Sequence, residues 1–346
     1  MNLIKIAFFF LFFSLSCFSK NPIKILTITE PLSYPKLSID FNNIIIGDRF
    51  YNYHIYSTDK GDLKKSFSLK GQGPGEFPFI TNEGIIDSVF WVSGTYKIAF
   101  YTLYGKLIRE LPYNKSISNC IMIDSNHYID ASRVFDENIS KYEVRRYYLL
   151  DNEFNKIKLL MSTKIPSNFT IQNNKKNIFM VRGCAKAIAY KDKIIIGSTE
   201  NGLNFWIYKK DGTLLKKIET SYQPSKISNE GKNEYLEYEF GPLLKNLKSS
   251  EFSYTINSHF PSFYNFYVDK SKIYVLHYPE KLTSDQYQSI TIIDFDGKLL
   301  KKSKITNVDW LQNDKFRHMT IFNNHFYYLK ENINNESWEL YKQQIE

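Results

Sequence analysis

The sequence predicts an all-β protein, and more narrowly a six-bladed β-propeller made of four-stranded antiparallel blades. Aromatic residues make up 16% of the 346 residues, with 26 Tyr and 27 Phe against 15 Gly, and this is the residue usage of strands. One unit also recurs six times along the chain. It consists of a short apolar strand, a polar turn, a second apolar strand, and two further strands joined by a turn. Four-stranded sheets repeated around an axis form a propeller.

The first two strands are the most regular part of each unit. Near-continuous apolar runs on the returning strands, such as Ile44–Ile46 and Ile194–Ile196, predict burial on both faces. Asn, Asp and Ser tolerate tight-turn geometry, so their position between the two strands predicts a hairpin. The six turns are Asn42–Asn43, Asp87–Ser88, Asp124–Asn126, Lys191–Asp192, Asp269–Ser271 and Asn323–Asn324.

The outer strands of the units form a second set of predicted hairpins. Their turns are Asp59–Gly61, Tyr104–Gly105, Asp151–Asn152, Asp211–Gly212 and Asp296–Gly297, where Gly supplies the positive φ that a hairpin requires. The sixth unit stops at Glu346 without room for a fourth strand. Ile23–Ile28 has strand-like composition and belongs to no other unit. We therefore expect this N-terminal strand to complete the last blade and close the ring.

Two insertions make the six copies unequal, at about residues 162–183 and 221–261 of a propeller that we expect to span residues 23–346. In the second insertion, Pro242–Glu251 has apolar spacing and Pro at its start, which predicts a short helix. Loops of this length are usually functional or mobile. A lid that covers one propeller face without a ligand is the alternative expectation.

The N-terminus resembles a secretory signal. Residues 1–16 contain the cation Lys5, an apolar run over Ile6–Phe13 and then small residues, too short for a retained spanning helix. Cys17 follows directly and resembles the lipidated cysteine of bacterial lipoproteins. Lipidation of Cys17 and plain cleavage near Ser16 or Ser19 are both expected outcomes. The mature chain is expected in the periplasm, at the outer membrane or at the cell surface, with a membrane contact only through such an anchor.

Charge and cysteine content exclude several classes of protein. Lys and Arg number 45 against 36 Asp and Glu, but the lysines are scattered over the outer strands, where they discourage edge-to-edge pairing. They form no concentrated patch for nucleic acid. Cys120 and Cys184 make no metal cluster or disulfide framework. A bridge between them and two buried free thiols are both conceivable, and we favour the free thiols.

A glycine-rich segment carries the sharpest family resemblance. Gly71–Phe77 reads GQGPGEF, and it is followed by two inner strands and a turn at Gly105–Leu107. This resembles an NHL repeat. The whole chain, from about residue 23 to 346, looks like the NHL/TolB-like six-bladed propellers of exported bacterial proteins, which are often lipoproteins. A phosphate-binding loop is the competing interpretation, but the segment lacks the Lys-Ser/Thr ending and does not enter a helix.

Candidate site residues follow from the propeller architecture, because the loops between blades and the loops between second and third strands share one face. These loops would place charged or polar side chains around the channel mouth, where a convergent set can bind a polar ligand. A surface side chain or an ion pair that fills the channel is the structural alternative for each. The residues are Asp48, Arg49, Glu83, Arg133, Arg182, His277 and His318.

The sequence favours binding over catalysis. A site of the kind found in lactonase-like six-bladed propellers would require oxygen ligands for a divalent metal such as calcium. Glu83 could begin such a set, but matching Asn and Asp positions are not recognisable. Too few of the six histidines are suitably placed for the zinc site of NHL-type lyases, and no nucleophile elbow is present.

We therefore expect a non-catalytic, monomeric propeller of the cell envelope that binds a protein or a small polar ligand, without a cofactor and without nucleic acid. A metal-dependent lactonase-like hydrolase or lyase at the central channel is the alternative. A purely structural envelope component is the third hypothesis.

Overall fold

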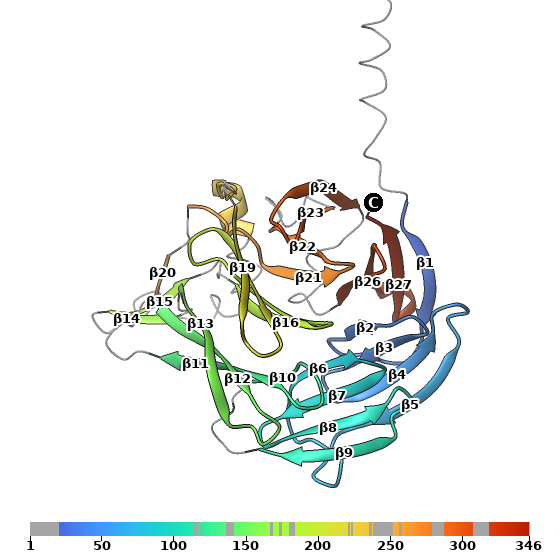
Figure 1. The fold of residues 1–346 in the computed structure, drawn as a ribbon. Helices are drawn as coiled ribbons and strands as arrows, with labels where there is room; N and C mark the ends of the chain where they lie inside the picture. Colours follow the sequence, from blue (N-terminus) through green and yellow to red (C-terminus); the bar gives the residue numbers. More distant parts are fainter. Residues whose placement is uncertain are drawn as a thin grey trace, which may run out of the picture.

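The molecule is a ring of six four-stranded antiparallel sheets, seen in Figure 1. The computed structural model describes residues 21–113, 117, 119–135, 142–166, 169–172, 175–179, 184–220, 222, 224–234, 237, 252–255, 258–278, 287–306 and 318–345. The prediction of a six-bladed β-propeller is confirmed. The signal segment and Cys17 lie outside the described residues, as do Arg182 and the predicted helix Pro242–Glu251.

The strands of the first three blades follow one another in sequence order. Blade one contains β2 (Lys36–Ile39), β3 (Asn43–Gly47), β4 (Asn52–Ser57) and β5 (Leu63–Ser68). Blade two contains β6 (Ile80–Ile86), β7 (Val89–Gly94), β8 (Lys97–Thr102) and β9 (Leu107–Pro112). Blade three contains β10 (Cys120–Met122), β11 (Tyr128–Phe135), β12 (Tyr142–Leu150) and β13 (Lys156–Pro166).

The last three blades repeat this order, with one exception in the sixth. Blade four contains β16 (Ala185–Tyr190), β17 (Lys193–Ser198), β18 (Leu203–Lys209) and β19 (Leu214–Thr220). Blade five contains β21 (Asn265–Asp269), β22 (Lys272–Leu276), β23 (Tyr287–Asp294) and β24 (Leu299–Thr306). Blade six contains β25 (Met319–Phe322), β26 (His325–Asn332), β27 (Ser337–Gln344) and β1 (Ile23–Ile28).

The N-terminal strand closes the ring, as the sequence predicts. β1 pairs antiparallel with β27, from Ile23 opposite Lys342 to Ile28 opposite Trp338. The Ile28 side chain is fully buried, in a cluster that also contains Ile44 of blade one. The two ends of the chain therefore share one sheet, and that sheet packs against the first blade.

The hydrophobic core lies between the blades rather than within one layer. The innermost strands β2, β6, β10, β16, β21 and β25 contact each other in a closed circle, and apolar clusters fill each gap farther out. Between blades one and two, for example, Ile45 and Tyr53 pack with Phe90 and Tyr101. Apolar side chains on both faces of the second and third strands are buried in this way, which explains their near-continuous apolar runs.

The turns adopt the geometry that their residues favour. The inner turn residues Asn323 and Asn324 both have positive φ, at 53° and 61°, the mirror-image turn that matches strand twist. Gly105 in an outer turn has φ 76°, and a Cβ there would lie 2.5 Å from the Phe67 ring of the preceding blade. This glycine is required both by the turn and by the close approach of two blades.

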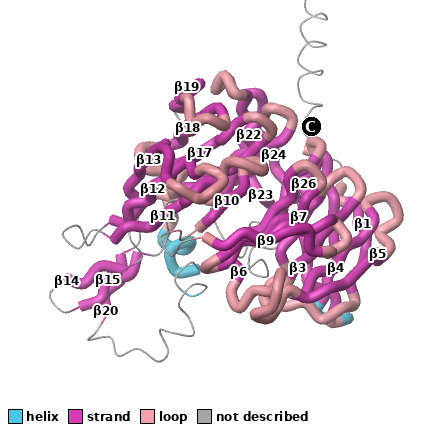
Figure 2. Tube along the Cα trace, turned by 60° about the horizontal axis from the view of Figure 1, so that its bottom comes forward, coloured by secondary structure: helices cyan, strands magenta, loops and turns pink. Residues whose placement is uncertain are grey.

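A small separate sheet comes from the two segments predicted as insertions. β14 (Phe169–Gln172) pairs antiparallel with β15 (Lys175–Phe179), and β15 pairs in parallel with β20 (Phe252–Thr255). Figure 2 shows this sheet to one side of the ring. β13 continues to Pro166, so it includes Ser162, the predicted start of the first insertion. Within the described segments, no helix combines the length and the apolar character that a membrane span needs.

Candidate functional site

A pocket of about 420 Å³ lies against the outer half of blade five, within the size range of small-molecule sites, about 300–1,000 Å³. Strands β23 and β24 form one part of its wall, and His277 and Tyr278, which follow β22, form another. Tyr222 and Ser225, in the segment that follows blade four, complete it. The pocket therefore lies where the end of one blade meets the outer strands of the next.

Strand register brings two hydroxyl groups and two amines onto one wall of the pocket. Ser289 of β23 pairs with Lys304 of β24, and Thr291 pairs with Lys302. Residues two apart on a strand share a face, and paired residues lie on the same face. All four residues line the pocket, so its wall combines cations with hydroxyl groups.

His277 is a buried part of this wall, with both ring nitrogens engaged. Its Nδ1 lies 2.7 Å from the Ser262 carbonyl oxygen, and its Nε2 lies 2.7 Å from Thr291 Oγ1. Because the carbonyl can only accept, Nδ1 carries the hydrogen and Nε2 accepts the Thr291 hydroxyl hydrogen. Burial lowers the pKa of His277 to about 4, and the charge of Lys302 adds to this effect. The imidazole is neutral at pH 7 and has no nitrogen available for proton transfer to a ligand.

Aromatic rings form the apolar part of the pocket. Tyr222 stacks on the His277 ring, with centroids 4.7 Å apart and planes inclined by 7°. Tyr278 stacks in the same manner on Phe260. The Lys304 ammonium lies 4.0 Å from the centroid of the Tyr287 ring, a cation–π contact. The pocket thus offers flat apolar surfaces beside its polar wall.

Polar contacts between neighbouring blades involve residues of the innermost strands. The Lys36 ammonium lies 3.4 Å from Glu83 Oε2, and the Tyr53 hydroxyl donates to the same oxygen at 2.6 Å. Between blades five and six, the Tyr267 hydroxyl donates to the Met319 carbonyl at 2.5 Å. Each contact crosses from one blade to its neighbour, so these groups hold the blades together.

Lys186 is a channel residue that the sequence analysis did not select. Its ammonium donates to Asn265 Oδ1 at 2.8 Å and lies 5.0 Å from the Tyr267 ring centroid. Burial lowers its pKa to about 8. Lys186 is the second residue of β16 and one of many lysines scattered along the chain, so its sequence context does not mark it as a site residue. It ties blade four to blade five through an amide rather than a carboxylate.

Asp48 and Arg49 have local roles in the loop after β3. Asp48 is buried, and its Oδ1 accepts the backbone N–H groups of Phe50 at 2.8 Å and Asn52 at 2.9 Å. The Arg49 guanidinium lies 5.0 Å from the Tyr34 ring centroid and 4.7 Å from that of Phe50. Asp48 therefore organises the turn, while Arg49 forms cation–π contacts at the surface.

The remaining predicted residues come from other blades. Arg133 lies with its Nε 3.4 Å from Glu143, and His318 is buried with its ring centroid 5.4 Å from that of Trp338. The predicted site residues that the structure describes contact other residues of the protein, and none of the contacts given above joins two of them. Of that set, His277 lines the pocket on blade five.

Two chemical alternatives can be compared with the geometry. Over the part of the chain that is described, no three His, Cys, Asp or Glu side chains are grouped as metal ligands. In the glycine-rich segment, the Gly73 amide donates to Glu76 and the Gly75 amide donates to Glu110. These amides are already engaged by carboxylates of the protein. Cys120 and Cys184 are not joined in a disulfide, and Cys120 is buried whereas Cys184 is partly exposed, unlike the expected pair of buried thiols.

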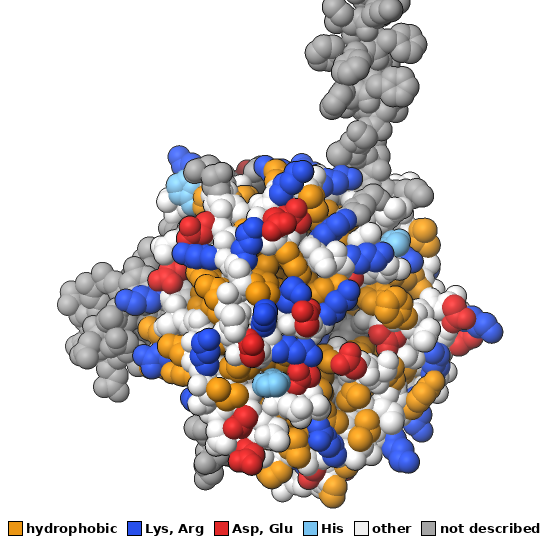
Figure 3. All heavy atoms as spheres, viewed as in Figure 1, with side chains coloured by type: hydrophobic (Ala, Val, Ile, Leu, Met, Phe, Trp, Pro, Cys, Tyr) orange, Lys and Arg blue, Asp and Glu red, His pale blue; other side chains and the backbone are white. Residues whose placement is uncertain are grey.

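Charged side chains of both signs are interspersed over the face in Figure 3. Several lysines of the described chain form ion pairs, such as Lys216 with Asp296 at 2.9 Å and Lys97 with Glu110 at 2.8 Å. This mixture is typical of a solvated surface and differs from the single-sign stripe of a nucleic-acid site.

The fold and the pocket define a six-bladed β-propeller with a pocket of mixed polar and aromatic lining on the outer half of blade five. Among solved structures, the chain is similar to a candidate exported protein from Bacteroides fragilis, with a TM-score of 0.53, 13% identity and 94% of each chain covered. BamB from Moraxella catarrhalis gives a TM-score of 0.33 and 8% identity over 88% of this chain and 84% of that protein. At these identities the first similarity concerns the fold alone. No protein-family model matches the sequence, and no curated protein matches it either.

Proposed function

We propose that this chain is an exported, non-catalytic propeller of the bacterial cell envelope that binds a small polar ligand in the pocket on blade five. The observation that carries the proposal is the composition of the pocket wall. It combines hydroxyl groups, aromatic rings and two lysines, with no carboxylate among the described residues that line it.

This wall is suited to binding rather than to acid–base chemistry. A general base must have a nitrogen or oxygen free to take a proton at the working pH. His277 is neutral, but both of its nitrogens are engaged within the protein. Hydroxyl groups and aromatic rings supply orientation and contact area instead.

Two observations support export and an envelope location. The first 16 residues have the composition of a secretory signal, and Cys17 follows directly. The fold is also similar to that of a candidate exported protein. In this proposal the propeller is either released after cleavage or tethered through a lipid on Cys17, and it works as a monomer. Intact-mass analysis of the native protein distinguishes the two processing outcomes.

Filling the pocket tests the proposal. The mature chain is screened against sugars, amino acids and nucleotides by ligand-observed NMR, and each hit is repeated with Ser289→Trp and Ser225→Trp. These variants place an indole in the pocket from β23 and from the segment after blade four, so both are expected to abolish binding while circular dichroism stays unchanged. Ser68→Trp, on the exposed outer strand of blade one, is the matched control and is expected to bind normally.

Two results would contradict the proposal. The first is ligand binding that persists in both folded pocket variants. The second is a metal-stimulated lactone hydrolysis that Glu83→Ala abolishes, which would favour a channel-face hydrolase instead.

A further inference from the structure

We propose that the ligand of the pocket on blade five is an acidic carbohydrate, a hydroxylated sugar ring that carries a carboxylate or an equivalent anionic group. This inference rests on the proposed function, because it names the ligand class for the same pocket. It follows from the charge, the hydroxyl groups and the aromatic rings of the wall taken together.

The described residues that line the pocket carry a net positive charge. Lys302 and Lys304 are two residues apart on β24 and line the pocket from the same face, with Cα atoms about 7 Å apart as in any strand. Long lysine side chains can converge from that distance on one anionic group. No carboxylate of the described chain lies within ion-pair distance of either ammonium. An anionic ligand would supply the missing negative charge.

Several other lysines of the outer strands are partnered within the protein. In blade one, Lys64 donates to the Asn42 carbonyl at 2.8 Å and to Asn43 Oδ1 at 2.9 Å. In blade four, Lys216 pairs with Asp296 and Lys217 pairs with Glu219. Outer-strand lysines are therefore common in this ring, but these are partnered by the protein. The pair on blade five differs because it faces a cavity.

The hydroxyl groups of the wall suit a sugar ring. Thr291 donates its hydroxyl hydrogen to His277, so towards a ligand it can only accept, and a sugar hydroxyl is a donor that it can accept from. Ser289 and Ser225 can donate or accept. A site with both kinds of partner recognises a ligand with several hydroxyl groups.

The aromatic rings of the pocket favour binding of a sugar acid over binding of a simple inorganic anion. A pyranose ring presents an apolar C–H face, which packs against an aromatic ring, whereas sulfate or phosphate gains nothing from that contact. Tyr222 and Tyr278 line the pocket and are each fixed by stacking on another ring. The positive charge of two lysines also matches the negative charge of one anionic group better than the several negative charges of a nucleoside triphosphate.

Calorimetric titration of the mature chain tests the inference with matched probes. D-glucuronate and D-galacturonate carry the carboxylate, D-glucose and D-galactose lack it, and glucose 6-sulfate and inorganic phosphate vary the anion. We expect the uronates to bind about tenfold or more tightly than the neutral sugars. Raising NaCl from about 0.05 to about 0.5 M should weaken the binding through screening.

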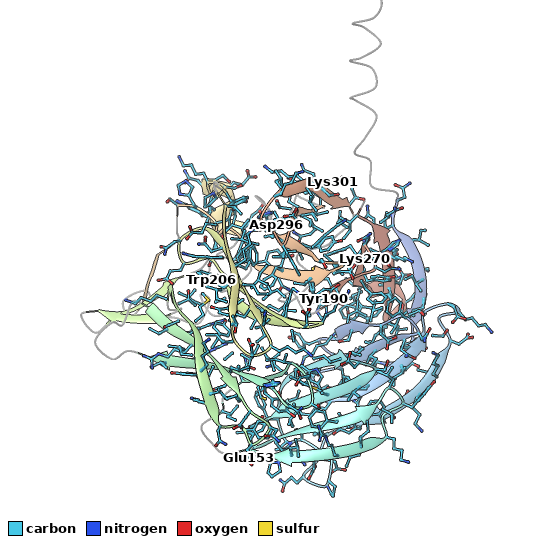
Figure 4. The ribbon with its side chains drawn as sticks, viewed as in Figure 1. Glu153, Tyr190, Trp206, Lys270, Asp296 and Lys301 are labelled. Atoms are coloured by element: carbon cyan, nitrogen blue, oxygen red, sulfur yellow. The ribbon has the colours of Figure 1, made fainter. Side chains whose placement is uncertain are left out.

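Lysine variants connect the affinity to this pocket. Lys302→Met with Lys304→Met should weaken uronate binding by about tenfold or more. Lys301→Met, on the same strand but outside the residues that line the pocket, should bind within about twofold of the parent. Figure 4 labels Lys301 at the outer part of the ring. Both variants keep the aliphatic part of the side chain, so loss of packing is not expected.

Several outcomes would overturn the inference. Equal affinity for neutral and acidic sugars, or no effect of the double lysine variant, removes the anionic group from the ligand class. Phosphate binding as tightly as uronate removes the sugar ring. In each case the proposed function would still hold if the parent protein bound another ligand and Ser289→Trp abolished that binding. A total absence of uronate binding overturns this inference alone, because the pocket variants test the broader proposal with other ligands.

Discussion

A buried neutral imidazole shapes one wall of the pocket. His277 is about 7% exposed, and its two hydrogen bonds fix Ser262 on one side and Thr291 on the other. Since a buried imidazolium would lose hydration without a carboxylate nearby, burial keeps the ring uncharged. His277 is therefore a positioning residue, and its tautomer determines which hydrogen-bond role Thr291 can offer to a ligand.

The burial of His277 predicts a pH-dependent stability. Its folded-state pKa of about 4 lies below an unfolded-state value of about 6.5, so between these values the unfolded chain binds the proton more tightly. Stability must then rise with pH over that range and fall on acidification. The expected contribution is about 3 kcal/mol between pH 4 and pH 7.

Urea denaturation at several pH values checks this expectation. His277→Asn keeps a donor near Ser262 but has no titration in this range. The difference in unfolding free energy between the parent and this variant should therefore grow from pH 4 to pH 7. Parallel pH profiles for the two proteins would show that the imidazole does not titrate as argued.

Side chains that cap turns could have been identified from sequence. Asp48 accepts the amides two and four residues ahead, and Asp151 and Asp294 do the same in their own turns. This is the local bonding that Asp favours. The repeated pattern therefore points to a structural role for Asp48. His277 could be proposed as a site residue because it follows an inner strand, but its neutral, engaged state depends on Ser262 and Thr291, which come from other segments.

At the level of strands and turns, the sequence contains most of the information. Hairpin turns were predicted correctly because their residues and the apolar runs beside them are local features. The pocket was not predicted, because it forms where the segment around Tyr222 meets strands β23 and β24. The alternation of apolar and polar residues within one strand cannot reveal a contact with a segment that is distant in the sequence. Lys302 and Lys304 look like ordinary surface lysines until their neighbours are known.

The glycine-rich segment between blades one and two is an element held by side chains of blade two. The Glu110 carboxylate accepts the Gly75 amide at 2.7 Å and the Lys97 ammonium at 2.8 Å. The hydrogen bond from Lys97 contributes most to lowering the pKa of Glu110, and the hydrogen bond from the Gly75 amide adds to this effect. Gly75 also has φ 70°, and a Cβ there would lie 3.1 Å from Leu107. This segment is therefore built as a junction between blades.

Alanine substitutions within this segment should have unequal effects. Gly75→Ala forces an L-residue into the left-handed region, which costs about 1–2 kcal/mol, and presses against Leu107. Gly73→Ala is the matched control because a Cβ there meets the flexible end of Glu76, and its effect should stay within about 0.5 kcal/mol. Urea denaturation measures both, and equal losses would contradict the role given to Gly75.

For the whole molecule, closure of the ring joins the first and last strands of the chain. A propeller blade buries its faces only against two neighbours, so a ring opened at blade six would expose apolar surface on both sides of the gap. β1 prevents this opening through its pairing with β27 and its packing towards blade one. Stability of the entire ring should therefore depend on a strand that lies outside the six-fold sequence repeat.

Two substitutions within β1 test this dependence. Ile28 is fully buried, so Ile28→Ala should lower the unfolding free energy by about 2–5 kcal/mol through lost burial and a residual cavity. Ile23 on the same strand is 65% exposed, and Ile23→Ala should change it by less than about 0.5 kcal/mol. Because the ring closes on blade one, hydrogen exchange in Ile28→Ala should also accelerate in β2 and β3, not only in β27. Acceleration confined to blade six would mean that the blades unfold independently and that β1 stabilises only its own sheet.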